Sequence, residues 1–261
     1  MTRANRRDRT LVGLVLGLAA VLAVPAPSYA QVKVIISGGF FPPYREVVPD
    51  FERTTGIAVS TASGASQGSG PDTIGAMLSR GELADVVIMN RSGLAELLAQ
   101  GRIVPGTDQN LAQTLTGVAV RAGAPKPDVS TVEAFRQSLL RAKTIASPGS
   151  SAADTTDLLA RLGISRDVAV KVPSRGTESV AMVARGEAAL SIQPVSEILN
   201  VPGVELAGTL PTELQHATVY AAAIVAGTKQ SESSRRLIAF LSSAGVRAAI
   251  ERSGMEPSPR R

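Results

Sequence analysis

The sequence has 261 residues, of which 44% are hydrophobic and 19% charged, a balance typical of globular proteins rather than disordered ones. It contains no cysteine and one histidine, His216, which excludes disulfides, thiolate metal sites, iron–sulfur clusters, cysteine nucleophiles and sites with two histidine ligands. The formal charge of +5 would by itself suggest a nucleic-acid partner.

Residues 1–30 have the pattern of a secretory signal peptide. Four arginines precede an apolar run over residues 11–24, which is shorter than the roughly 20 residues that span a bilayer. Ser28-Tyr29-Ala30 has the small residues of a cleavage site. We predict cleavage after Ala30, export to the periplasm and no membrane anchor afterwards. Cleavage removes four arginines and one aspartate, so the charge falls to 23 − 21 = +2 and no nucleic-acid partner is expected.

Strands and amphipathic helices are expected to alternate along the rest of the chain. Strands are predicted at residues 32–36, 57–61, 84–89, 144–146, 168–172, 190–192 and 219–225. Helices are predicted around residues 44–51, 74–78, 94–98, 133–140, 155–162, 178–185 and 231–242. Ser130 and Glu133 are expected to form a capping box for the fourth helix. This order predicts an α/β fold with a mostly parallel sheet and helices on both faces.

Four loops that follow strands are rich in glycine and hydroxyl side chains, at residues 37–39, 64–70, 147–151 and 174–177. In an open parallel sheet such loops lie at the carboxyl ends of the strands, where ligands bind. Glycine lets backbone N–H groups approach a ligand, and each following helix offers unpaired N–H groups to an anion. The pattern therefore favours a site for a small anion, although the same residues also serve as ordinary helix caps and turns.

Candidate ligand-binding residues come from these loops and from two arginines beside them. They are Ser37, Gly38, Gly39, Ser66, Gln67, Ser69, Ser150, Ser151, Thr177, Arg91 and Arg175. The two arginines could clamp carboxylates with paired hydrogen bonds. No phosphate-binding loop, calcium loop or metal-binding motif occurs in the sequence, so neither a metal nor a cofactor is expected.

One loop also matches the nucleophile elbow of serine hydrolases, at Gly64-Ala65-Ser66-Gln67-Gly68. His216 lies downstream, as that reading requires. However, the match follows only the second predicted strand, and a further glycine, proline and aspartate stand before the next helix. A serine hydrolase is therefore a remote alternative.

Several segments together resemble the periplasmic molybdate-binding-protein-like family of type II extracellular solute-binding proteins. They are Ser37-Gly38-Gly39-Phe40 and residues 51–56, 80–88, 185–188, 219–229, 239–241 and 253–257. The resemblance implies the type II periplasmic-binding-protein fold, with two α/β lobes, two crossover strands and a ligand cleft between the lobes. We predict lobe I at residues 31–118 plus 220–261 and lobe II at residues 119–219, with crossovers near 117–121 and 217–221.

The contacts of the family transfer to this sequence only in part. Gly39 stands where molybdate binders carry a serine, and Ser66 or Ser69 could take a serine role in the longer second loop. Gln193 stands about where the family has a tyrosine, which makes it a further candidate ligand-binding residue.

The first loop, the long second loop and Val195-Ser196-Glu197 resemble a subgroup that includes periplasmic aconitate isomerase. Such an enzyme moves a proton on an unsaturated tricarboxylate without a metal, and it requires a base. The candidate bases are Glu178, Glu197 and His216.

We therefore expect an exported solute-binding protein that captures a small anion, an oxyanion or a polycarboxylate, in the interlobe cleft. It would act as a monomer and deliver the anion to an ABC-type membrane permease. The alternative is an enzyme similar to aconitate isomerase. A carboxylate base inside the cleft would favour the enzyme, whereas a cleft of hydroxyls and amides alone would favour the binding protein.

Overall fold

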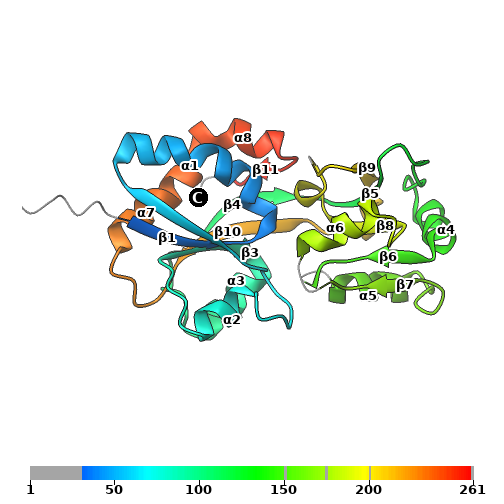
Figure 1. The fold of residues 1–261 in the computed structure, drawn as a ribbon, viewed down its shortest axis with the longest axis horizontal. Helices are drawn as coiled ribbons and strands as arrows, with labels where there is room; N and C mark the ends of the chain where they lie inside the picture. Colours follow the sequence, from blue (N-terminus) through cyan, green and yellow to red (C-terminus); the bar gives the residue numbers. More distant parts are fainter. Residues whose placement is uncertain (1–30, 150–151, 174–175, 200, 260–261) are drawn as a thin grey trace, which may run out of the picture.

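The computed structural model describes residues 31–149, 152–173, 176–199 and 201–259. Two lobes lie side by side along the long axis of the molecule (Figure 1). Each is built around its own sheet, a six-stranded one of order β11-β4-β10-β3-β1-β2 and a five-stranded one of order β7-β6-β8-β5-β9. The predicted two-lobe α/β architecture is therefore confirmed.

The elements have the following bounds. The strands are β1 Gln31–Ile36, β2 Ala58–Ser63, β3 Val86–Asn90, β4 Gln109–Thr114, β5 Thr116–Arg121, β6 Thr144–Ala146, β7 Ala169–Lys171, β8 Leu190–Pro194, β9 Val204–Thr209, β10 Thr218–Ile224 and β11 Glu256–Pro257. The α-helices are α1 Phe41–Thr55, α2 Ile74–Ser79, α3 Arg91–Ala99, α4 Val132–Ala142, α5 Ala152–Arg161, α6 Gly176–Ala184, α7 Ser231–Leu241 and α8 Arg247–Arg252. Short 3₁₀ turns are η1 Gly38–Phe40, η3 Val195–Glu197, η4 Thr212–Leu214 and η5 Ala244–Val246.

Both sheets are mixed, so the expectation of a mostly parallel sheet is wrong. β1 pairs in parallel with β2 and β3, and β6 pairs in parallel with β7 and β8. By contrast, β10 runs antiparallel to β3 and β4, and β5 runs antiparallel to β8 and β9. The apolar runs between helices predict the parallel units, whereas the antiparallel strands carry the chain into and out of the second lobe.

Lobe I buries apolar residues on both faces of its sheet. On one face α1, α7 and α8 pack over β1, β3 and β10, and on the other face α2 and α3 do so (Figure 1). Helix α1 follows the predicted pattern, because Tyr44, Val47, Val48 and Phe51 are all buried. It ends at Gly56, which takes the left-handed conformation (φ 69°) that favours glycine as a helix terminator.

Lobe II has a smaller core of the same kind. Phe135 and Leu139 of α4 are fully buried against the sheet, with α5 beside them and α6 on the opposite face. The predicted capping box is wrong by one residue, because Thr131 accepts the hydrogen bond from Ala134 N (3.1 Å) that caps α4. Ser130 instead donates its hydroxyl to Asp128 (2.7 Å).

The chain passes between the lobes at two neighbouring places. Only Leu115 separates β4 from β5, and the chain returns through the segment between β9 and β10. Gln215 in the returning segment bonds to both backbone groups of Thr116, accepting from its N–H (2.7 Å) and donating to its carbonyl (3.2 Å). Thr116 Oγ1 donates to the carbonyl of His216 (2.8 Å). The two crossovers are thereby tied to each other.

Among the helices that the structure describes, none is both long and apolar enough to cross a membrane.

Candidate functional site

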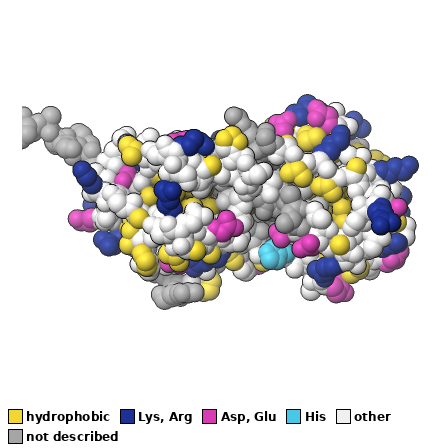
Figure 2. All heavy atoms as spheres, turned by 90° about the horizontal axis from the view of Figure 1, so that it is seen from below, with side chains coloured by type: hydrophobic (Ala, Val, Ile, Leu, Met, Phe, Trp, Pro, Cys, Tyr) yellow, Lys and Arg dark blue, Asp and Glu magenta, His cyan; other side chains and the backbone are white. Residues whose placement is uncertain are grey.

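A cavity of about 360 Å³ opens between the two lobes. Lobe I contributes Ser66, Gln67, Asn90, Arg91, Ser92 and Ala95, and also Thr218, Val219 and Tyr220 of β10. Lobe II and the returning crossover contribute Asp154, Pro194, Glu197, His216 and Ala217. The histidine lies at the waist of the molecule, with acidic side chains beside it (Figure 2). Among the sequence-based candidates, Ser66, Gln67, Arg91, Glu197 and His216 meet in this cavity, which we call the cleft.

A hydrogen-bond network fixes the lobe I wall of the cleft. Ser66 Oγ accepts from the backbone N–H of Asn90 (3.0 Å). Gln67 Oε1 accepts from Asn90 Nδ2 and from Ser92 Oγ (3.0 Å each), and Gln67 Nε2 donates to Glu96 (2.6 Å). Asn90 also caps α3 by accepting from Gly93 N (2.8 Å). The long second loop is therefore held against the start of α3 before any ligand arrives.

The arginine at the cleft is already paired. Arg91 Nη1 lies 2.6 Å from Asp108 Oδ2, and both side chains are partly buried. An anion approaching this wall would thus meet a cation whose charge is largely balanced.

On the lobe II side, a carboxyl group lies deep in the cleft. Glu197 Oε1 accepts a hydrogen bond from the phenol of Tyr220 (3.1 Å), which is itself almost fully buried. Burial of the carboxyl raises the pKa of Glu197 to about 6, although the phenol hydrogen bond acts in the opposite direction. Burial and the neighbouring Glu197 charge raise the pKa of Tyr220 well above its ordinary value, so the phenol stays protonated and can donate.

Two other residues hold this pair in place. Gly39 lies against the ring of Tyr220, because a Cβ atom on Gly39 would come within 1.8 Å of the phenol oxygen. Any side chain at position 39, including the serine of molybdate binders, would displace Tyr220. Gln193 is buried, donates to the backbone carbonyl of Glu197 (3.1 Å) and accepts from Ser179 Oγ (2.6 Å). Its amide therefore supports the Glu197 backbone.

Two buried hydroxyls near this pair have no hydrogen-bond partner within the described part of the chain. Ser37 Oγ lies just before η1, which packs against η3, and Ser196 Oγ lies next to Glu197 in η3. Ser196 Oγ is near enough to Tyr220 to lower the pKa of that phenol, but it forms no hydrogen bond of normal geometry. Unpaired buried hydroxyls are costly. Neither serine is among the residues that line the cleft, however.

The remaining sequence-based candidates lie elsewhere. Glu178 pairs with Arg185 (2.5 Å) in an exposed position and does not line the cleft. Gly38 and Ser69 are exposed. Ser150, Ser151, Arg175 and the side chain of Thr177 fall outside the described residues.

The loop that matches a nucleophile elbow does not have the geometry of one. An elbow turns directly from strand to helix, whereas residues 64–73 stand between β2 and α2. Ser66 Oγ bonds to the Asn90 backbone, and no hydrogen bond between it and His216 occurs among the described residues. This arrangement does not support a serine hydrolase.

The sequence reasoning missed several residues of the cleft, namely Asn90, Ser92, Asp154, Thr218 and Tyr220. Asn90 could have been found, because an asparagine directly after a buried strand is a typical helix cap. Tyr220 could not, because it lies within an apolar strand and its role depends on Glu197 and Gly39. No group of three or more potential metal-ligating side chains occurs in the part of the chain that the structure describes.

The fold and this cleft define a solute-binding protein, and the sequence agrees. The chain belongs to the family of bacterial extracellular solute-binding proteins, whose pattern it matches over residues 32–256. It is 36% identical over 252 residues to an aconitate isomerase from Pseudomonas, covering 94% of this chain and 96% of the relative.

Solved structures share the fold. The periplasmic molybdate-binding protein of Azotobacter vinelandii superposes with a TM-score of 0.66 at 19% identity, over 88% of this chain and 100% of that one. The sulfate-binding protein SubI of Mycobacterium tuberculosis superposes with a TM-score of 0.70 at 18% identity, over 87% of each chain. The predicted family and type II fold are confirmed.

Proposed function

We propose that this protein captures a small polycarboxylate in the cleft and moves a proton on it, as an aconitate isomerase does. The observation that carries the proposal is the Glu197 carboxyl, which lines the cleft in a partly buried position and hydrogen-bonds to Tyr220, with its pKa raised to about 6. A protein that only binds an anion gains nothing from a second negative charge at the site, whereas a proton-transfer enzyme requires a base there.

The chemistry follows from where that carboxyl lies. Glu197 as the carboxylate removes a proton from the methylene carbon of cis-aconitate, and the electrons of the C–H bond spread over the neighbouring double bond and carboxylates. The protonated Glu197 then returns the proton to the former vinyl carbon, which shifts the double bond and yields the trans isomer. A raised pKa makes the carboxylate a stronger base for this step.

Charge that develops on the ligand during transfer is to be stabilised by neutral donors. The amides of Gln67 and Asn90 and the hydroxyl of Ser92 line the cleft and are suited to this role. The similarity to an aconitate isomerase supports a polycarboxylate substrate, because the 36% identity extends over nearly the whole chain.

Proton NMR of the purified protein with cis-aconitate tests the proposal directly. We expect catalytic appearance of trans-aconitate, with turnover lowered about 10²- to 10⁴-fold by Glu197→Gln. Glu178→Gln is the matched control, because that carboxyl is exposed and paired with Arg185 outside the cleft, and it should leave turnover unchanged. Absence of trans-aconitate with the unmodified protein would refute the isomerase.

The second candidate is capture without turnover, favoured by the amide and hydroxyl side chains on the lobe I wall of the cleft and by the oxyanion-binding proteins that share the fold. A ligand at 100 times its dissociation constant should stabilise the protein by about 2.7 kcal/mol. A melting shift with molybdate, sulfate or cis-aconitate that is not accompanied by conversion would select this candidate.

We further propose that the signal peptide, residues 1–30, is cleaved after Ala30, that the mature protein works in the periplasm as a monomer and that it serves an ABC-type permease if it acts in uptake. The basic, apolar and small-residue order of residues 1–30 supports export. Mass spectrometry of the periplasmic fraction should find a chain that begins at Gln31, and a full-length chain held in the membrane would contradict this.

A further inference from the structure

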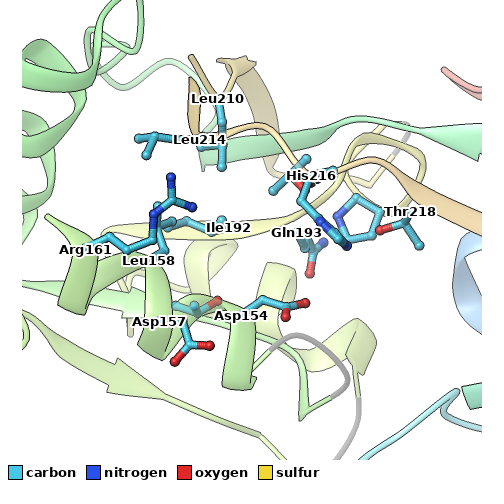
Figure 3. Close-up of a pocket in the computed structure, with 13 residues that line it drawn as sticks. Asp154, Asp157, Leu158, Arg161, Ile192, Gln193, Leu210, Leu214, His216 and Thr218 are labelled. Atoms are coloured by element: carbon cyan, nitrogen blue, oxygen red, sulfur yellow. Dashed lines mark hydrogen bonds between the residues drawn. The ribbon is translucent and has the colours of Figure 1, made fainter. Parts of the chain in front are cut away.

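A second cavity, of about 270 Å³, lies within lobe II beside the cleft. One part of its lining is apolar and consists of Leu158, Ile192, Leu210 and Leu214, which all belong to the buried core of this lobe. Polar side chains, among them Thr116, Thr155 and Gln193, line the rest. Figure 3 shows these side chains gathered between α5 on one side and η4 on the other. We call it the lobe II cavity.

The lobe II cavity adjoins the cleft. Asp154, Pro194, His216 and Thr218 line both spaces. His216 is exposed and stands where the two meet, while Arg161 lies at the far end (Figure 3). The two spaces therefore share a boundary that includes the His216 side chain.

The side chains around the lobe II cavity indicate which chemical group it would accept. Asp154 and Asp157 line one side, and Arg161, the cation at the far end, donates to the carbonyl of Glu213 (3.2 Å). The cleft has the same balance, with Asp154 and Glu197 against Arg91, so charge does not distinguish the two spaces. The four apolar side chains, in contrast, offer a surface on which hydrocarbon leaves water at no polar cost.

We propose that the lobe II cavity takes a neutral alkyl substituent of a polycarboxylate whose charged groups lie in the cleft. The inference rests on the proposed function and deepens it, because it extends the ligand class from plain polycarboxylates to those that carry a short alkyl chain. The carboxylates stay on the Glu197 side, and the chain passes His216 into the apolar space.

Calorimetric titration with a homologous series tests this. The probes are tricarballylate, a saturated tricarboxylate that cannot isomerise, and its methyl, propyl and pentyl derivatives. Each added methylene should tighten binding about fourfold until the cavity is full, as expected for hydrocarbon removed from water. Affinity that stays flat or falls along the series in the unmodified protein would overturn the inference.

Variants locate the effect. Leu214→Trp fills the lobe II cavity from η4, and Leu210→Phe fills it from the neighbouring position. Either variant should abolish the increase in affinity with alkyl length and leave the affinity for tricarballylate itself unchanged. Leu83→Trp, at a highly exposed leucine that lines neither space, is the control and should keep the gain. If affinity still increases with alkyl length in both filling variants, the alkyl group binds elsewhere and the inference is refuted. Absence of tricarballylate and cis-aconitate binding would instead refute the polycarboxylate function on which it rests.

Discussion

Gly39 and Tyr220 are in such close contact that position 39 has no room for a side chain. A Cβ atom there would lie 1.8 Å from the phenol oxygen and 2.0 Å from the ring carbon that bears it. The phenol in turn donates to Glu197. The glycine of the first loop, the tyrosine of β10 and the glutamate of η3 are thus one packed unit, drawn from both lobes and a crossover.

Substitution of Gly39 should disturb this unit. We expect Gly39→Ala to lower the free energy of unfolding by about 1–3 kcal/mol, because the added methyl forces Tyr220 to move, and to reduce turnover as Glu197 loses its partner. Gly75→Ala is the matched control: its Cβ would meet only Leu97, at an ordinary 3.5 Å. Urea denaturation of both variants checks the prediction, which fails if the two behave alike.

Removal of the phenol hydroxyl should move the titration of Glu197 upward. The Tyr220 hydrogen bond favours the charged carboxylate, so Tyr220→Phe should raise the pKa of Glu197 above its value of about 6. Carbon-13 NMR of labelled glutamate follows that carboxyl without relying on activity. In the enzyme, the acidic limb of the kcat/KM profile should shift to higher pH by the same amount. An unchanged or lowered pKa would argue against the hydrogen bond.

Stability should depend on pH through the same carboxyl. Its pKa is raised from 4.5 to about 6 on folding, so the folded state binds the proton more tightly than the unfolded state. The free energy of unfolding should therefore fall as pH rises from about 4.5 to 6, by roughly 2 kcal/mol in total. Denaturation at several pH values should show this slope in the unmodified protein and its loss in Glu197→Gln. Identical slopes in both would contradict the assignment.

The two crossovers should loosen when Gln215 is removed. Gln215→Ala removes the side-chain partner of the Thr116 N–H and one of two donors to the Thr116 carbonyl, which keeps its bond from Leu210 N–H (3.1 Å). We expect about 1–3 kcal/mol lower stability and a wider range of lobe angles. Small-angle X-ray scattering measures the latter as a larger radius of gyration. Gln113→Ala, which removes an exposed bond to Glu256, should change neither quantity. A radius of gyration equal to that of the unmodified protein would contradict the view that Gln215 restrains the movement of the two lobes.

Much of the fold could be predicted from local pattern. Strands such as β1 and β3 are short apolar runs followed by helices with a buried face, and this pattern identified the parallel units of both lobes. β4 and β9 were missed because their residues are mixed and only partly buried. Their pairing depends on β10 and β5, which are distant in sequence.

The site was harder to predict than the fold. Glu178 and Glu197 both lie in the first turn of a helical segment, and nothing local distinguishes them. Burial beside Tyr220 gives one a raised pKa, while an exposed arginine pairs with the other. That difference arises only when residues from separate parts of the chain come together. Composition could exclude thiolate and histidine-rich sites, but not choose between two carboxylates.

The position of β10 between β3 and β4 also sets the order in which the lobes can be completed. A chain made from its N-terminus releases β1 to β4 first, but β3 and β4 do not pair with each other, so this sheet remains open in the middle. All five strands of the other sheet emerge before β10 does. Lobe II, which is inserted within the sequence of lobe I, can thus finish folding before lobe I receives its central strand β10.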